Sequence, residues 1–445
     1  MTILRLFLFF IASLIFSLGA FAAQAFASAL GGAELSASPV AQPKMQSVAP
    51  SAAAPSKSKD WTLMVFMSGK NDLGRYVAQD INRMEMAGSG AGVNVVVQAA
   101  TLEDGLGAVR YHITQDGNEA AIASQGERIS VADMGGKAAL SEFMKWAMRT
   151  YPAKKYALVI WSHGFGWDGQ GAGGGEGKRA LSPDMVTGNV LSDRELAEVL
   201  GSAAKTAGKP LDLLVTDACG MQMLSSLAEL QGRVGVVVGS EDTVPADSGL
   251  PYQAIVSQLN QTPGQGAEEL GRFITAAYRD LHPDHIGVSA VRTDRIEPFV
   301  GKLNAWIDAL VSCGNHGRTA ESVARLQGFY DYSRATDLSG TPLPKDIFQL
   351  VEAVTCDLKS AKLATPELTA AAEALEQYRQ EIVLANSQDD LSGLSEYVPK
   401  DLYNSAYDDM TLSKISRWDD FLKWLLDPQY SYPLPKTAKG GQAAP

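Results

Sequence analysis

Two short motifs combine a reactive side chain with glycine, and each directly follows an apolar run. Residues 161–167 (WSHGFGW) contain His163, and residues 216–221 (TDACGM) contain Cys219. An imidazole beside a thiol favours the reactive thiolate and can later protonate a leaving amine. The backbone N–H groups of Gly164 and Cys219 are suited to bind a developing oxyanion. The motifs together predict nucleophilic catalysis by Cys219, with His163 as acid and base.

Each residue taken alone has a plainer interpretation. A cysteine after a buried strand is usually an inert core residue, and a lone histidine is more often structural. We interpret the histidines without glycine-rich surroundings as surface or structural residues; these are His112, His282, His285 and His316. No Cys or His pair has the spacing of zinc ligands.

Two other segments resemble known catalytic or binding motifs but lack residues that those motifs require. Residues 172–179 (AGGGEGKR) resemble a phosphate-binding loop, but the first glycine is missing and Arg179 stands where Ser or Thr is required. The HGFG at His163 is similar to a lipase oxyanion loop, yet the chain contains no G-x-S-x-G nucleophile motif. Nucleotide hydrolysis and lipase chemistry are therefore disfavoured.

The elements that must position the two motifs form an α/β pattern. Nearly continuous apolar runs predict strands buried on both faces, at residues 63–67, 93–99, 156–161, 211–215, 234–238 and 287–292. Helical segments alternate with them, at residues 73–86, 137–149, 192–204 and 263–279. This order predicts a mostly parallel, doubly wound sheet, with residues 109–114 adding an antiparallel hairpin. Since ligands bind beyond the carboxyl ends of such strands, we expect His163 and Cys219 to share one crevice.

Toward the C-terminus, the alternation of strands and helices gives way to helical patterns. Amphipathic helices are predicted at residues 296–310, 343–359, 366–384 and 418–426, with a late strand at 393–398. We therefore expect a catalytic domain over residues 60–299, a helical subdomain over 300–432 and a flexible tail over 433–445.

The N-terminus is typical of an exported protein. Residues 1–27 have one cation, Arg5, then an apolar run and small residues, as in a cleaved signal peptide. A retained membrane anchor is the alternative, because the apolar run is long enough to span a bilayer. Residues 28–59 are rich in Ala, Ser and Pro, which indicates a linker or propeptide. We expect a periplasmic or extracellular location, where Cys313 and Cys356 could pair.

Composition excludes several classes of protein. The chain has 445 residues, a net charge of −12 and a pI near 5.0, which argues against nucleic-acid binding. Its 46% hydrophobic and 20% charged residues are ordinary for globular protein, so it is neither disordered nor a polytopic membrane protein. Three cysteines cannot build a disulfide-dense scaffold.

On these motifs, the sequence resembles the clostripain-like cysteine peptidases of the caspase-like clan, which includes gingipains, legumains and separases. The resemblance spans about residues 60–425 and rests on motifs that occur in the family's order. They are an opening strand and acidic loop at 61–72 followed by Asp80, the histidine motif at 163–167, the cysteine motif at 217–221, a pocket segment at 239–252 and a late signature at 393–399 (GLSEYVP).

The resemblance implies a caspase-like fold that hydrolyses peptide bonds after basic residues. His163 would be the general acid and base, Cys219 the nucleophile and Asp217 the floor of the S1 pocket, where it would pair with Arg or Lys. Asp217 could instead be a structural carboxylate that caps the following turn. Weaker candidates for this pocket are Ser240 and Asp242. Leu250 departs from the family pattern, which has a bulky aromatic there, and this leaves the fine substrate preference open.

The resemblance also implies activation by self-cleavage between the two catalytic motifs. A glycine-rich stretch at 169–177 precedes Lys178 and Arg179, so we expect cleavage after one of these residues. The alternative is a linker with ordinary charges. Calcium is used by some relatives, although the chemistry requires no cofactor. Possible calcium ligands in this chain are Asp72, Asp80, Glu241 and Asp242, without a fixed calcium-loop pattern.

The sequence therefore predicts an exported, monomeric cysteine endopeptidase that acts on proteins or peptides with basic P1 residues. It predicts no nucleic-acid partner, and no membrane association after signal cleavage. One alternative is a non-catalytic binding or scaffold protein on the same fold. Another is a transpeptidase, because hydrolysis and acyl transfer share a thioester intermediate.

Overall fold

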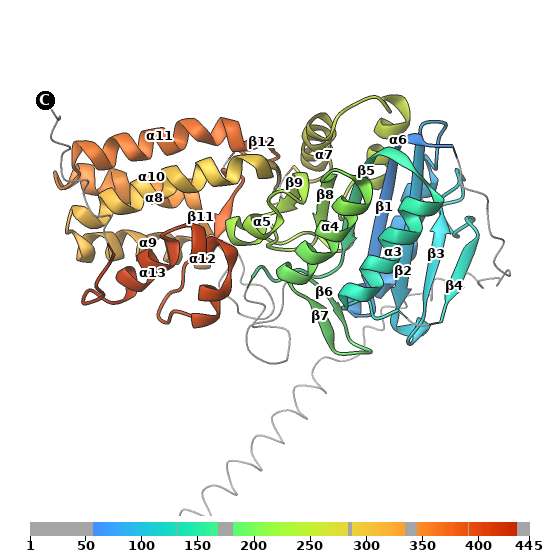
Figure 1. Ribbon diagram of the computed structural model, residues 1–445, viewed down its shortest axis with the longest axis horizontal. Helices are drawn as coiled ribbons and strands as arrows, with labels where there is room; N and C mark the ends of the chain where they lie inside the picture. The colour runs from blue at the N-terminus through green and yellow to red at the C-terminus, as the bar shows by residue number, and fades with distance from the viewer. Residues whose placement is uncertain are drawn as a thin grey trace, which may run out of the picture. The chain divides into compact units, whose positions relative to one another are not determined.

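The computed structural model describes residues 57–130, 132–167, 181–283, 287–333, 345–389 and 391–433. Within them, one sheet has the strand order β12-β10-β9-β8-β5-β1-β2-β3-β4 (Figure 1). The strands are β1 (Lys59–Gly69), β2 (Val93–Thr101), β3 (Ala108–His112), β4 (Gly126–Ile129), β5 (Ala153–Trp161), β8 (Leu211–Asp217), β9 (Val234–Ser240), β10 (Val288–Arg292) and β12 (Val383–Asn386). The central strands from β9 to β2 are parallel, and antiparallel strands flank them. The predicted α/β class and the antiparallel hairpin are both confirmed.

Helices cover both faces of this sheet, as the continuous apolar strands require. Successive residues of β1 point to opposite faces, so that Leu63 and Val65 join one buried cluster while Met64 and Phe66 join the other. The cluster around Leu63 includes side chains from α2 (Val77–Glu85), α6 (Tyr252–Gln261) and α7 (Ala267–Leu281). The cluster around Met64 includes side chains from α3 (Lys137–Thr150), α4 (Asp193–Ala207) and α5 (Leu224–Leu230).

Local signals in the sequence fix several helix ends. The Ser192 side chain accepts a hydrogen bond from the Glu195 N–H, and the Glu195 carboxylate accepts one from the Ser192 N–H, so α4 begins with a capping box. The segment expected as a helix at 73–86 begins instead with a 3₁₀ turn, η1 (Asp72–Tyr76), which the Asn71 side chain caps. A small antiparallel hairpin, β6 (Leu181–Asp184) with β7 (Asn189–Leu191), precedes α4.

The C-terminal residues are mainly helical, as expected, and they extend the cluster around Met64. The helices are α8 (Ile296–Ser312), α9 (His316–Ser333), α10 (Ile347–Ser360), α11 (Pro366–Ile382), α12 (Thr411–Ile415) and α13 (Trp418–Leu426). Short 3₁₀ turns are η3 (Thr293–Arg295), directly before α8, and η4 (Ser405–Asp409), whereas η2 (Leu102–Asp104) lies between β2 and β3. One difference concerns residues 383–384, which were expected within a helix. They begin β12, which pairs with β10, so residues beyond 299 contribute an edge strand to the sheet.

The late strand, the cysteines and the helices were also subjects of predictions from the sequence. The late strand at 393–398 is reduced to β13 (Ser395–Glu396), which pairs with β11 (Lys345–Asp346). The three cysteines are free thiols, so the pairing of Cys313 with Cys356 that the sequence left open does not form. None of the described helices combines the length and apolar character needed to cross a membrane. Residues 1–27, most of 28–59 and the tail from 434 lie outside the described residues.

Candidate active site

The register of the sheet places the two reactive motifs side by side. Strands β5 and β8 are parallel neighbours, and Trp161 at the end of β5 pairs with Asp217 at the end of β8. His163 lies two residues beyond Trp161, and Cys219 lies two residues beyond Asp217. Both side chains therefore belong to loops that leave the same edge of the sheet, as the sequence predicted.

Glycine is required where these two loops touch. A Cβ atom on Gly164 would overlap the carbonyl oxygen of Cys219 and would lie 2.9 Å from both the Ala218 Cβ and the Met221 Cγ. Any larger residue at position 164 would therefore push the histidine loop away from the cysteine loop. The backbone of Gly164 also forms a bridge to Leu181. The close packing keeps the Gly164 backbone beside Cys219, where the oxyanion role was predicted.

A carboxylate that the sequence did not assign to catalysis holds the imidazole. The His163 Nε2 and the Asp72 Oδ1 atoms lie 2.7 Å apart, in a hydrogen bond. Asp72 begins η1 directly after β1, which is the neighbour of β5 on the side away from β8. Partial burial raises the pKa of Asp72, but the hydrogen bond and the charge of His163 together lower it by more. The pKa of Asp72 is therefore below its usual value. Asp72 is therefore ionised at neutral pH and orients the ring.

The Cys219 side chain is half-buried, and its sulfur contacts the next loop of the sheet. The Val244 N–H donates to the Cys219 Sγ over 3.3 Å. The Gly220 N–H donates to the Asp242 carbonyl oxygen over 2.9 Å, which joins the same two loops through their backbones. A backbone donor at the sulfur favours the thiolate over the thiol.

Asp217 is buried beneath the segment that follows β9. Its side chain is 5% exposed and accepts a hydrogen bond from the Tyr252 hydroxyl over 2.7 Å. Gly249 lies directly against it, since a Cβ there would be 3.3 Å from the Asp217 Oδ2. Burial, and then the nearby Asp80 carboxylate, raise the pKa of Asp217 to about 7, although the hydrogen bond from Tyr252 opposes this.

Asp80 forms the second half of this acidic pair. It accepts hydrogen bonds from the Trp161 Nε1 over 2.8 Å and from the Arg83 guanidinium over 2.7 Å. Burial raises its pKa to about 6, against the opposing charge of Arg83. Arg83 also donates to the Ser248 carbonyl oxygen, so it links the pair to the segment that covers Asp217. Two carboxyl groups with raised pKa values are thus buried together at the ends of the strands that carry the site.

The two weaker pocket candidates lie in the same region but are almost fully buried. The Ser240 hydroxyl donates to the Gly287 carbonyl oxygen and accepts from the Asp242 N–H. The Asp242 carboxylate accepts from the Thr243 N–H over 2.6 Å. The contact with Gly287 joins two neighbouring segments, and the other two contacts shape the turn after β9. The role of both residues in substrate binding stays a prediction.

The remaining predictions concern processing and calcium. Lys178 and Arg179 lie outside the described residues. Among the described residues, no group of three or more His, Cys, Asp or Glu side chains could hold a metal ion. The proposed calcium ligands instead have separate partners: Asp72 contacts His163, and Asp80 contacts Arg83.

Comparison with known proteins decides the family. The clostripain family (peptidase C11) matches residues 65–423, which is most of the chain. The chain belongs to the clostripain family. It is accordingly a cysteine peptidase, and its substrates are proteins or peptides. No curated protein matches the chain.

Solved clostripain-family structures share the fold. A secreted C11 cysteine protease from Bacteroides thetaiotaomicron, in complex with an irreversible peptide inhibitor, is 16% identical with a TM-score of 0.57, and the match covers 81% of this chain and 99% of that chain. An inactive zymogen C11 protease from Parabacteroides distasonis is 18% identical with a TM-score of 0.52, covering 84% and 98%. At such low identity these structures support the fold alone.

Proposed function

We propose that this clostripain-family chain is an exported cysteine endopeptidase that cleaves after Arg or Lys. The observation that carries the proposal is the pairing of the ends of β5 and β8: the loops of His163 and Cys219 leave the same edge of the sheet, and the buried Asp217 lies two residues before Cys219. A nucleophile, an acid–base group and a recessed negative charge are the three elements that cleavage after a basic residue requires. Export is supported by the signal-like residues 1–27.

The chemistry follows from these groups. His163 accepts the proton of the Cys219 thiol, and the sulfur attacks the carbonyl carbon of the scissile peptide bond. The Gly164 and Cys219 N–H groups stabilise the oxyanion that forms. The C–N bond then breaks, and His163 gives its proton to the leaving amine, which leaves a thioester on Cys219. Water, deprotonated by His163, hydrolyses the thioester and releases the acid product with the free thiol.

Asp72 has a positioning role in this scheme. It holds the imidazole through Nε2 and stabilises the imidazolium ion that forms during attack. We expect Asp72→Asn to lower kcat about tenfold, because an exposed carboxylate is partly screened by solvent. KM should change little. Steady-state kinetics of this variant beside Asp401→Asn, an exposed residue of another loop, would measure the effect. Equal kcat values in the two variants would show that Asp72 has no such role.

Binding of a basic P1 side chain is assigned to Asp217, with Asp80 adding negative charge behind it. A guanidinium or ammonium group would replace the Tyr252 hydroxyl as the partner of the Asp217 carboxylate. This exchange requires the Gly249 segment to move, because Gly249 now lies against the carboxylate. Substrate binding is thereby coupled to a change in the segment that also contacts the Cys219 sulfur.

Cleavage after Lys178 or Arg179 is proposed to activate the enzyme. It would separate a fragment that carries β1 to β5 from one that carries β8, β9, β10 and β12. We expect the two fragments to stay together in native conditions, because five residue pairs join β5 to β8 within the buried sheet. A denaturing gel and N-terminal sequencing would show both fragments, and gel filtration would show one species. An active enzyme that keeps an uncut bond at both residues would disprove this activation step.

The experiment that tests the proposed function is a specificity panel. The purified protein is incubated, under reducing conditions with and without calcium, with matched fluorogenic peptides ending in Arg, Lys, Asp or Leu. Hydrolysis of the Arg and Lys peptides alone is expected. Hydrolysis of the Asp or Leu peptides would keep the peptidase and overturn the pocket assignment. No hydrolysis by the folded, cleaved protein would favour a binding protein, and new amide products with an added amine would favour transfer.

A further inference from the structure

The late signature at residues 393–399 has no part in the proposed chemistry, yet it contacts two of the loops at the active edge. The Gly393 N–H donates to the Glu241 carboxylate over 2.7 Å, next to the end of β9. The Ser395 N–H donates to the Gln222 carbonyl oxygen over 3.0 Å, three residues after Cys219. Ser395 also forms a parallel bridge to Met223. This segment therefore lies as an extra strand beside the chain that leaves the cysteine motif.

Glu396 is the charged centre of this contact. Its side chain is fully buried and accepts hydrogen bonds from the Ser225 N–H over 2.5 Å, the Tyr397 N–H over 2.8 Å and the Tyr407 hydroxyl over 2.9 Å. Ser225 lies in the first turn of α5, so one oxygen of Glu396 fixes the element that follows the cysteine loop. The other oxygen fixes Tyr407 and its own backbone segment.

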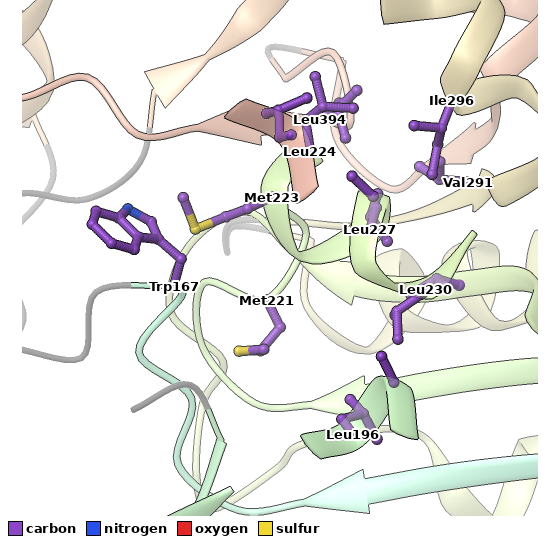
Figure 2. Packing of buried hydrophobic residues seen from close by; sticks show 14 of the residues in the cluster. Trp167, Leu196, Met221, Met223, Leu224, Leu227, Leu230, Val291, Ile296 and Leu394 are labelled. Carbon is purple, nitrogen blue, oxygen red and sulfur yellow. The ribbon is translucent and has the colours of Figure 1, made fainter. Parts of the chain in front are cut away.

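The two tyrosines connect Glu396 to the histidine loop. The Trp167 ring stands edge-on to the Tyr397 ring at 4.8 Å and to the Tyr407 ring at 4.9 Å between centroids. Trp167 ends the histidine motif, four residues after His163. Figure 2 shows the Met223 thioether reaching toward the Trp167 indole, and a Cβ atom on Gly166 would lie 2.6 Å from the Met223 Sδ, so Met223 packs against the histidine loop. Such edge-to-face ring pairs are favourable and fix the ring orientation.

We propose that Glu396 is a positioning residue that sets the distance between His163 and Cys219. One branch of its hydrogen bonds runs through Ser225 to the cysteine loop, and the other runs through Tyr407 and Trp167 to the histidine loop. This inference rests on the proposed function, since that function defines the reacting pair. It assigns a role to a part of the chain that lies more than 170 residues from Cys219 in sequence.

The electrostatics of the site agree with a role in orientation. Burial raises the pKa of Glu396 to about 7, while the hydrogen bonds from Tyr397, Ser225 and Tyr407 oppose the shift. An apolar residue would fill this position without the cost of removing a carboxylate from water. A buried carboxylate with three directed donors gives the two loops one defined arrangement, which an apolar side chain does not.

The experiment uses Tyr407→Phe and Glu396→Gln, with Tyr403→Phe as the matched control. Tyr403 belongs to the same aromatic cluster, but its hydroxyl donates to Asp408 rather than to Glu396. Each protein is assayed on the Arg peptide for kcat and KM. The rate at which iodoacetamide alkylates Cys219 is measured by peptide mass spectrometry, which separates Cys219 from Cys313 and Cys356. Melting temperatures report folding.

We expect Tyr407→Phe and Glu396→Gln to lower kcat about tenfold with KM within twofold, and Tyr403→Phe to leave both unchanged. Alkylation of Cys219 should slow in the same two variants, because the thiolate depends on the nearby imidazole. Lower melting temperatures with unchanged kcat and alkylation would overturn the inference. If the wild type cleaves no Arg or Lys peptide, the proposed function fails, and the alkylation rates of Cys219 alone test the role of Glu396. Slower alkylation in Tyr407→Phe and Glu396→Gln than in Tyr403→Phe would support that role, and equal rates in the three variants would overturn it.

Discussion

Replacing His163 by alanine is expected to lower kcat on an Arg peptide about 10⁴-fold. Without the imidazole, nothing in the proposed scheme removes the thiol proton of Cys219 or protonates the leaving amine. KM should stay within a few-fold, because the acidic pair of Asp217 and Asp80 is untouched. The effect should exceed that of Asp72→Asn, since Asp72 acts only through the ring.

The matched control for this variant is His316→Gln. His316 lies on α9, and its Nε2 contacts the carbonyl oxygens of Trp424 and Leu425, so its loss affects packing in the helical region. We expect near wild-type kcat from this control. A kcat for His163→Ala within threefold of the control, with both proteins folded by circular dichroism, would remove His163 from the mechanism.

Replacing Asp217 by asparagine is expected to reduce kcat/KM for Arg and Lys peptides about 100-fold or more, because a buried charge pair with good hydrogen bonds is worth several kcal/mol. Asparagine keeps the size of the side chain and can still accept from the Tyr252 hydroxyl, so the fold should be preserved. Alkylation of Cys219 should be nearly unchanged. Equal losses in both measurements would show that Asp217 supports the cysteine loop rather than the substrate.

The pH profile gives an independent test of the same residue. Burial and the Asp80 carboxylate raise the pKa of Asp217 to about 7, so the carboxyl is protonated below this pH and ionised above it. Only the ionised form pairs with a guanidinium. We therefore expect kcat/KM for the Arg peptide to rise as pH increases through about 7, and this rise to flatten in Asp217→Asn. An identical profile in both proteins would assign the rise to another group.

The sequence predicted those parts of the fold and site that depend on local patterns. Apolar runs such as residues 211–215 and 234–238 directly predicted buried strands, and the Ser192 capping box marks the start of α4. Once the strands were parallel, His163 and Cys219 had to leave the same edge. Their pairing thus followed from strand order, without knowledge of any side-chain contact.

Other features depend on tertiary contacts that no local pattern records. Helix α6 begins after Pro251 without a side-chain cap, and β12 follows α11 without a glycine or proline to mark the change. Asp72 was visible as an acid after the first strand, but its contact with His163 depends on β1 lying beside β5. Glu396 fell within the predicted late strand at 393–398 and was given no role, because its burial arises only when Tyr407 and α5 close around it.

The most direct test of the account is covalent labelling of the wild-type protein. Two peptide chloromethyl ketones that differ only in a terminal Arg or Asp are compared, and the labelled residue is mapped by mass spectrometry. We expect one adduct, on Cys219, with the Arg reagent and little reaction with the Asp reagent. An adduct on Cys313 or Cys356, or equal labelling of Cys219 by both reagents, would contradict it.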